Sequence, residues 1–250
     1  MNIRVIKSPS AGFPFAVIYK PAGLPSAPLE DGGDSALVQA CSLFPEIGRV
    51  CGKKAVERGL VHRIDTATSG LLLMASSQES YDSALRFQHE GKFVKFYRAG
   101  IDRRIHGKPS AAGFPDFAAV YPDIAAALDE YFSGGAVPPT VFSVESLFRR
   151  FGPGGRQVRP VAANSGRAAL RKSGACLYST SVRIVGHDTA ECSIRAGFRH
   201  QVRCHLSWCG IPVRGDRLYN PESCVDAMEF SAFRIDFPDP GTGRILSFSV

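Results

Sequence analysis

A single carboxylate, Asp65, lies between two apolar segments in the stretch GLVHRIDTATSG at residues 59–70. Arg63 precedes it by two residues, and the apolar segment SGLLLMA starts four residues after it. Because a carboxylate that enters a protein core loses hydration, it requires a partner or a chemical task. Asp65 is therefore a candidate catalytic or ion-paired residue, and an Asx turn at a strand edge is the structural alternative.

A second group of reactive side chains lies in RHQVRCHLSWCG at residues 199–210. The pattern predicts a helix that ends at Gly210, with Pro212 just beyond it. Arg199 and Arg203 are four residues apart and so share one helical face, and Gln201 and His205 share another. One face offers guanidinium groups and the other offers hydrogen-bonding side chains. An exposed basic helix is the alternative interpretation.

The same stretch contains His200, Cys204, His205 and Cys209, which are residue types that bind zinc. His200 and Cys204 share one helical face, whereas His205 and Cys209 share a face about 100° away. Four ligands therefore cannot converge on one ion from this helix. The seven cysteines are odd in number and form no C-x-x-C pair, which argues against a zinc ribbon and against a disulfide framework. We expect no metal.

The elements that position these residues are predicted to be short strands and a few helices. Ser76 and Glu79 have the spacing of a capping box for a helix that Gly91 ends. Pro122 is expected to open another helix. Helices are predicted at 81–90, 122–132 and 199–210, and strands at 16–20, 59–65, 70–76, 92–101, 191–198, 230–237 and 244–250.

This irregular alternation predicts an α+β fold with a mixed, mostly antiparallel sheet and flanking helices. The pattern weakens at about 102–144, where glycine and proline are frequent, and this segment is predicted to be a surface insertion. The 250 residues permit one large domain or two small ones. We expect one domain over 1–250.

The composition, with 44% hydrophobic and 21% charged residues, is that of an ordinary globular protein. No run of about 20 apolar residues is present, as a membrane span requires, and the N-terminal residues lack the pattern of a signal peptide. We expect a cytoplasmic protein that does not bind membranes, and a monomer.

The net charge is +7, and its distribution is uneven. No acidic residue occurs between Ser146 and His187, where eight arginines and lysines lie, nor between Cys192 and Gly215, where four arginines lie. Two such segments could form one basic face, and a polyanion is the expected partner. A solvated basic surface is the alternative.

Four motifs in order resemble the RluA-type pseudouridine synthases. They are YKPAGL, HRIDTATSGLLLMA, KFYRAG and RHQVRCHLSWCGIPVRGDRLY. The family forms are a K-P-x-G-L turn, H-R-L-D-x-x-T-S-G-L, a K-x-Y strand, and a T-G-R-x-H-Q-I-R-x-H-L helix closed by G-x-P-x-x-G-D-x-x-Y. The resemblance covers residues 19–100 and about 165 to the end, and leaves the predicted insertion uncovered. It implies one catalytic domain over 1–250, and we expect no separate S4-type RNA-binding domain.

The resemblance implies an isomerase that cleaves the C1′–N1 bond of a uridine in RNA, rotates the base and rejoins it through C5. No electron or atom is gained, so no cofactor is expected. Asp65 corresponds to the catalytic carboxylate, which acts at the base, at C1′ or as a base on the sugar. Arg203 corresponds to an arginine that pairs with it, and Tyr97 to a tyrosine that stacks on the target base and helps remove the C5 proton. These three would line a central catalytic cleft.

For RNA contacts, Arg63 corresponds to the residue that fills the space of the flipped nucleotide. Phe198 stands where the family has an arginine, and Arg199 takes the variable position beside it. Arg199 is therefore our second candidate for binding RNA. The RNA is expected to be rRNA or tRNA.

Two other functions remain open from the residues. One is a catalytically inert RNA-binding protein of the same fold, which loss of Asp65, Tyr97 or Arg203 would favour; all three are present. The other is a hydrolase that uses Asp65 with His62 or His205. The sequence lacks a serine or cysteine nucleophile in a recognisable elbow, and it lacks a second suitable carboxylate near Asp65.

Overall fold

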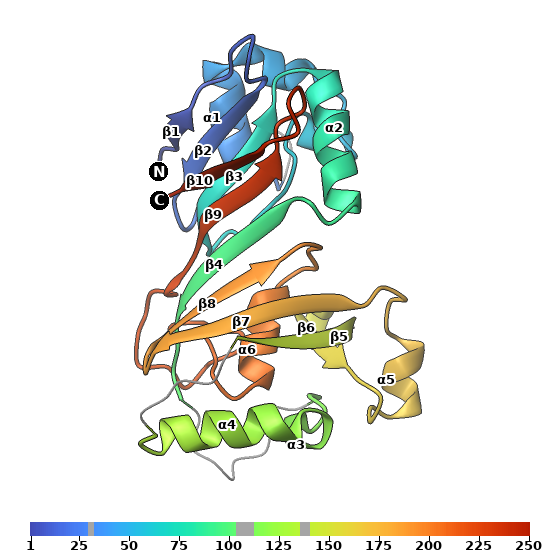
Figure 1. Cartoon of the computed structure of the whole chain (residues 1–250). Helices are drawn as coiled ribbons and strands as arrows, with labels where there is room; N and C mark the ends of the chain where they lie inside the picture. The colour runs from blue at the N-terminus through green and yellow to red at the C-terminus, as the bar shows by residue number, and fades with distance from the viewer. Residues whose placement is uncertain (30–32, 104–112, 136–140) are drawn as a thin grey trace. The chain divides into compact units, whose positions relative to one another are not determined.

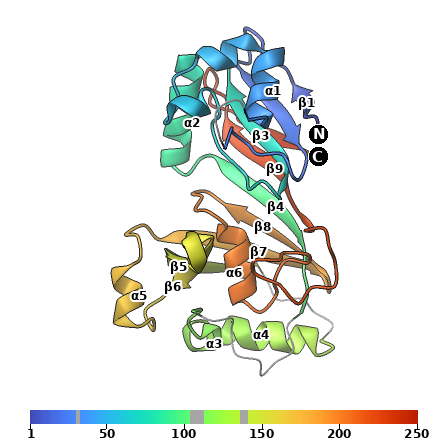
Figure 2. The same cartoon turned by 180° about the vertical axis from the view of Figure 1, so that it is seen from behind.

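The computed structural model describes residues 1–29, 33–103, 113–135 and 141–250. The chain divides into two compact units (Figures 1 and 2). The first unit contains Met1–Phe96 and Ser231–Val250, and the second contains Tyr97–Phe230. Strand β4 (Val94–Gly100) carries the chain from the first unit into the second.

The first unit is built on strands in the order β1-β2-β3-β9, with β10 paired to β9 (Figure 1). Adjacent strands in this order run antiparallel, as do β9 and β10. The exception is the pair β3 and β9, which run parallel where Ser69 lies opposite Ser231. The strands are β1 (Arg4–Lys7), β2 (Phe15–Lys20), β3 (Ser69–Ala75), β9 (Phe230–Pro238) and β10 (Ile245–Ser249). Strands β2 and β3 are almost entirely apolar and buried, as expected for the centre of a core.

Helix α2 (Gln78–His89) packs against β3 and completes the core of this unit. Tyr81, Ala84 and Phe87 on its inner face join Phe15 and other apolar residues of the sheet in one buried cluster. The remaining helical elements are α1 (Ala36–Leu43), which lies in front of the strands in Figure 2, and the 3-10 turns η1 (Pro45–Arg49) and η2 (Ala55–Glu57).

The predicted capping box at Ser76 and Glu79 is wrong by one residue. Ser77 caps α2, and its hydroxyl accepts from the backbone N–H of Ser80, whose side chain in turn accepts from the backbone N–H of Ser77. The cause lies in the sheet, because the backbone N–H of Ser76 donates to the carbonyl of Pro14. This bond keeps Ser76 with the strands, so the helix starts one residue later.

The second unit contains an antiparallel sheet in the order β8-β7-β5-β6. Its strands are β5 (Phe142–Phe151), β6 (Gln157–Val161), β7 (Tyr178–Gly186) and β8 (Thr189–Ile194). Helix α6 (Gln201–Trp208) packs against β6 and β7, and all eight of its residues are buried. The other helical elements of the second unit are α3 (Phe117–Val120), α4 (Pro122–Phe132), η3 (Pro153–Gly155) and α5 (Arg167–Arg171).

The predicted insertion at 102–144 belongs to the second unit, and its described residues make close contacts within that unit. The indole of Trp208 on α6 contacts the rings of Phe117 and Tyr121 edge-on, and its Nε1–H donates to the carbonyl of Pro115 at 2.8 Å. On α4, Tyr131 stacks on His187 at 4.7 Å. Residues 104–112 and 136–140 of this segment lie outside the described residues.

The predicted fold class is confirmed, because the sheets are mixed, mostly antiparallel and flanked by helices. The predicted strand at 59–65 is wrong. Leu60 forms one bridge with Met74, and Val61 donates to Leu73, but the pairing then stops. The backbone N–H of Leu73 donates to the imidazole of His62 instead of a carbonyl, so a side chain replaces the next step of the ladder.

Candidate active site

Asp65 lies in a turn whose backbone is held on both sides. The Thr68 N–H donates to the Asp65 carbonyl at 3.0 Å, which closes the turn. On the preceding side, Ser26 Oγ donates to the carbonyl of Ile64 at 2.7 Å and accepts from the Ile64 N–H at 3.2 Å. The neighbour Ile64 is buried, whereas Asp65 is partly exposed. Asp65 therefore sits on a fixed backbone at the edge of the core.

Lys20, which the sequence indicated only as part of a turn motif, holds the Asp65 turn in place. Its Nζ donates to the carbonyls of Pro21 at 2.9 Å, Leu24 at 2.7 Å and Thr66 at 3.1 Å. The side chain is fully buried, and burial lowers the pKa of Lys20 to about 8, while the negative charge of Asp65 acts in the opposite direction. Lys20 thus joins the KPAGL turn to the segment that follows Asp65. The only sequence signal for this role of Lys20 is its position beside the turn-forming Pro21.

The two histidines of the hydrolase hypothesis are buried and neutral. Burial lowers the pKa of His62 to about 3, with a smaller contribution from the charge of Lys95. Burial likewise lowers the pKa of His205 to about 3. His205 bonds to Ser146 through Nε2 and to Thr180 through Nδ1, at 2.9 and 2.8 Å. Neither imidazole is suited to exchange a proton near pH 7, so this geometry disfavours the hydrolase hypothesis.

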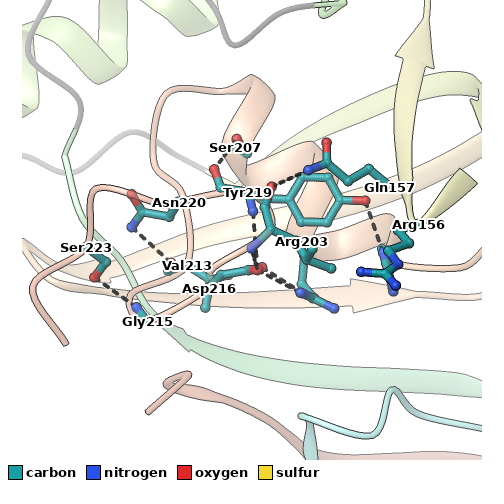
Figure 3. A network of polar contacts seen from close by, with 12 residues as sticks. Arg156, Gln157, Arg203, Ser207, Val213, Gly215, Asp216, Tyr219, Asn220 and Ser223 are labelled. Carbon is teal, nitrogen blue, oxygen red and sulfur yellow. Dashed lines mark hydrogen bonds and ion pairs between the residues drawn. The ribbon is translucent and has the colours of Figure 1, made fainter. Parts of the chain in front are cut away.

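Arg203 forms a two-point ion pair with Asp216 (Figure 3). The Nε–Oδ2 and Nη2–Oδ1 distances are both 2.7 Å, and the side chains are 5% and 0% exposed. Asp216 Oδ1 also accepts from the backbone N–H of Leu218 at 3.0 Å. The ring of Tyr219 lies beside the guanidinium, 5.4 Å from Cζ to the ring centroid. A bidentate pair with these supports fixes the guanidinium plane.

Asp216 and Tyr219 were missed as site residues, although both belong to the GDRLY motif. The Tyr219 hydroxyl accepts from the Val158 N–H at 2.9 Å and lies 3.1 Å from His200 Nδ1. The close turn that brings Asp216 to Arg203 depends on Gly215, which has φ +72° and whose missing Cβ would lie 2.1 Å from the carbonyl oxygen of Ala227. The motif therefore positions Arg203.

Arg199 lies outside α6, so the predicted shared helical face with Arg203 is wrong. The helix begins at Gln201, and His200 before it has the left-handed conformation with φ 57°. Arg199 instead donates to the carbonyls of Gly155 at 3.2 Å and Arg156 at 3.1 Å. At the start of the helix, the side chain of Gln201 accepts from the Phe198 N–H at 2.9 Å and so holds the preceding turn.

Phe198 is partly buried and packs against an apolar cluster of the second unit. Its ring stacks on Phe148 with centroids 4.9 Å apart and an interplanar angle of 5°, and it also contacts Tyr178. Packing on an aromatic cluster explains how an apolar side chain is accommodated where the related motif has an arginine.

Tyr97 lies on the inward face of β4. It is 7% exposed, and its ring stacks on Phe230 at 5.2 Å with an interplanar angle of 7°. The next residue, Arg98, points to the opposite side and pairs with Glu191 at 2.9 Å. The alternation of the strand therefore places the phenol, and not the neighbouring guanidinium, toward the interior.

Arg63 lies at the surface two residues before Asp65. Its side chain is 58% exposed and its Nη1 lies 3.0 Å from Glu57 Oε1. The Glu57 side chain is only 13% exposed, so the pair joins an exposed guanidinium to a mostly buried carboxylate. The guanidinium is therefore open to a ligand at the surface while it is paired with Glu57.

The basic residues between Ser146 and His187 do not share one role. Arg159 is buried with its guanidinium 4.4 Å from the ring centroid of Phe114 and 4.2 Å from that of Phe151. Arg183 pairs with Glu191. The exposed members are Arg150, Arg156, Arg167, Arg171, Lys172 and Arg183.

The structure brings some of these residues together within each unit. Asp65, Arg63 and Lys20 belong to the first unit, and Tyr97, Arg199 and Arg203 belong to the second. The pairing of Arg203 with Asp65 stays a prediction. Among the described residues, no three histidine, cysteine, aspartate or glutamate side chains form a group that could hold a metal ion. Within the same residues, no helix is long and apolar enough to cross a membrane.

Residues 14–208 match the family model described as RNA pseudouridylate synthase. The chain is 27% identical over 208 residues to ribosomal large subunit pseudouridine synthase D of Zymomonas mobilis, covering 81% of this chain and 52% of the relative. It is 24% identical over 246 residues to the protein of that name from Neisseria meningitidis serogroup B, covering 93% and 54%. The chain thus spans about half the length of these relatives.

Solved structures agree on the fold. Human RNA pseudouridylate synthase domain containing 1 has a TM-score of 0.61 and 18% identity, covering all of this chain and 83% of the human chain. Human RNA pseudouridylate synthase domain containing 4 has a TM-score of 0.57 and 18% identity, covering 94% and 84%. Because the family match extends over most of the chain and includes Asp65, Tyr97 and Arg203, the chain belongs to the RNA pseudouridylate synthase family and is of the RluA type.

Proposed function

We propose that this protein is an RNA pseudouridine synthase, an isomerase that converts a specific uridine of structured RNA to pseudouridine. The observation that carries the proposal is the family match over residues 14–208, within which Asp65, Tyr97 and Arg203 are all present. In the reaction the C1′–N1 bond breaks and a C1′–C5 bond forms. C5 loses a proton and N1 gains one, so the product has the composition of the substrate.

Asp65 is the proposed catalytic carboxylate. Its backbone is fixed by Ser26 and Lys20 through the residues on either side. A carboxylate on a rigid turn can be aimed at C1′ or at the base without the entropic cost of ordering a loop. This support is what a nucleophile or base at a crowded sugar requires.

Arg203 is the proposed partner that keeps Asp65 ionised and oriented. Its bonds to Asp216 use Nε and Nη2, and a guanidinium has five N–H donors in a planar fork. A second carboxylate bound through Nη1 would lie in that same plane. Asp216 then acts as a positioning residue, since it sets the direction in which Arg203 presents its remaining N–H groups.

Tyr97 is the proposed group that stacks on the target base and assists removal of the C5 proton. A uridine within a stem must leave its stack at a cost of a few kcal/mol. Arg63 is proposed to fill the space that the flipped nucleotide leaves, and the exposure of its side chain suits that role. Arg199 is proposed to contact RNA while it anchors the carbonyls of Gly155 and Arg156.

The proposed substrate is rRNA or tRNA. The printed names of the relatives from Zymomonas mobilis and Neisseria meningitidis refer to the large ribosomal subunit, which favours rRNA as the first RNA to examine. We further propose that residues 1–250 form one catalytic domain with a surface insertion at about 102–144, and that the protein acts as a cytoplasmic monomer without a metal or other cofactor.

Pseudouridine mapping of total cellular RNA, with and without the gene, tests this function. We expect one or a few uridines to lose modification in the deletion strain and to regain it with the wild-type gene but not with Asp65→Asn. Purified protein should also modify RNA from the deletion strain. An unchanged map together with salt-sensitive RNA binding would favour the inert RNA-binding protein instead.

A further inference from the structure

Lys95 is a buried cation without an acidic partner among the described residues. It lies on β4, two residues before Tyr97 on the same face of the strand, and is 7% exposed. Its Nζ lies 5.9 Å from the ring centroid of Phe93. No described residue accepts a hydrogen bond from this ammonium group or pairs with it. Such an arrangement is costly, because a buried charge is normally paired.

A second hydrogen-bond donor beside Lys95 also lacks an acceptor. His62 Nε2 accepts from the Leu73 N–H at 3.2 Å, so the neutral ring carries its proton on Nδ1. Nδ1 is buried, and no described group accepts from it. His62 and Lys95 both contact the Phe93 ring, and the charge of Lys95 acts on His62. Two donors therefore lie close together, and neither has an acceptor in the part of the chain that the structure describes.

Lys53 adds a further positive charge to this place. It is exposed, and its backbone N–H is fixed by donation to the Tyr81 hydroxyl at 3.0 Å. Lys53 lies close enough to Lys95 for its charge to act on it. In a protein alone, two cations that approach without an intervening carboxylate repel each other. The arrangement becomes favourable when an anion with several acceptor oxygens is bound.

We propose that Lys95, assisted by Lys53, binds a backbone phosphate of the RNA next to the target uridine. This inference rests on the proposed function, because it deepens the same RNA site. Lys95 and Tyr97 lie on one face of β4, about 7 Å apart by the rise of two strand residues. That separation is close to the distance between a base and the phosphates that flank its nucleotide. A phosphate matches the donors better than a metal, since a lysine ammonium and a protonated imidazole nitrogen offer no lone pair.

Binding of a labelled ten-nucleotide uridine oligomer, measured over a range of chloride concentrations, tests the phosphate site. Lys95→Met should weaken binding roughly tenfold and lower the slope of log affinity against log salt by about 0.7 for one single-strand phosphate. Lys54→Met is the matched control, because Lys54 is an exposed neighbour outside the proposed site. A slope equal to that of the wild-type protein would overturn the proposal.

Two further measurements separate the site from a packing role and from a free anion. The thermal midpoint of Lys95→Met in chloride should equal or exceed that of wild type, because an unpaired buried charge is removed; a large fall would make Lys95 a structural residue and reject the site. Replacing chloride by inorganic phosphate at equal ionic strength should displace the oligomer from wild type more than from Lys95→Met. Phosphate displacement with an unchanged RNA slope would assign the site to free phosphate and reject our proposal.

The inference and the proposed function can fail separately. If wild-type protein forms no pseudouridine in any cellular RNA but Lys95→Met still has the smaller salt slope, the phosphate site stands and the isomerase function fails. If wild type is active and Lys95→Met binds the oligomer with an unchanged slope, the isomerase function stands and the phosphate site fails.

Discussion

Arg203 and Asp216 join through two hydrogen bonds of 2.7 Å, although 13 residues separate them in the chain. Both side chains are withdrawn from solvent, and the ring of Tyr219 lies against the guanidinium. Removal of one member leaves a buried charge without its counterion, whereas removal of both leaves none. Substituting one or both members of this pair therefore tests whether Asp216 holds Arg203 in place.

We predict that Arg203→Met lowers the free energy of unfolding by about 3 kcal/mol, because Asp216 loses its partner. The double variant Arg203→Met/Asp216→Asn should recover part of this loss. Urea unfolding of wild type, both single variants and the double variant measures the coupling. Effects that add without coupling would show that the pair does not act as a unit.

Asp65→Asn should abolish pseudouridine formation, because the substitution keeps the volume and removes the charge. RNA affinity and the unfolding midpoint should change little, since the turn is held through Ser26, Lys20 and the backbone of Thr68. Single-turnover assays with excess enzyme provide the measurement. Substantial residual turnover would remove Asp65 from the catalytic role.

Tyr97→Phe should bind RNA almost as well as wild type but lose most of its turnover. The phenylalanine ring still stacks on Phe230 and can stack on a base, while the hydroxyl is absent. The comparison of kcat with KM separates the two roles. Unchanged kcat would limit Tyr97 to stacking and packing.

The pH dependence of the free energy of unfolding should show the effect of burying the Lys95 ammonium group. Burial lowers the pKa of Lys95 in the folded protein to about 8 from its usual 10.5. Between these values the unfolded chain binds more protons than the folded one, so wild type gains stability as pH rises through this window. Lys95→Met lacks this contribution, and its stability relative to wild type should fall by up to about 3 kcal/mol from pH 8 to pH 10.5. Unfolding of both proteins at matched pH measures the difference.

Local sequence patterns predict most of the helices and strands that position these residues. They do not predict which residues far apart in the chain form hydrogen bonds or ion pairs. The helix at 122–132 was predicted with its observed bounds, because Pro122 opens it and glycines follow it. The strand at 59–65 was wrong because His62, whose imidazole bonds to the backbone of Leu73, ends the ladder. No periodicity signals that kind of bond.

The same limit applies to the candidate site. The motifs predict Asp65, Tyr97 and Arg203 as site residues, whereas Lys20 and Asp216 lie inside those motifs without a predicted role. A lysine that donates to three carbonyls and an aspartate that holds a distant arginine are recognised by their partners in the folded chain. The prediction that Arg199 lies on the helix rested on spacing alone. It is wrong because His200 has a left-handed conformation, so the helix begins only at Gln201.

The acid-free segment from Ser146 to His187 contains a turn with the sequence GPGG, and exposed Arg150 and Arg156 lie on either side of it. Arg199 holds this turn through two carbonyls. If the turn binds RNA, Arg150→Gln/Arg156→Gln should weaken binding and reduce the salt slope by about 0.7 to 0.9 for each phosphate that these arginines neutralise. Salt titrations of oligomer binding measure this slope.

The matched control for this turn is Arg167→Gln/Arg171→Gln, which removes two exposed charges from α5. The control should keep the wild-type slope, because its charges lie outside the turn. Equal reductions in both double variants would mean that the segment acts through its total charge. An unchanged slope in Arg150→Gln/Arg156→Gln would show that this turn does not contact the RNA, and would leave Arg63, Arg199 and Lys95 as the basic residues to test.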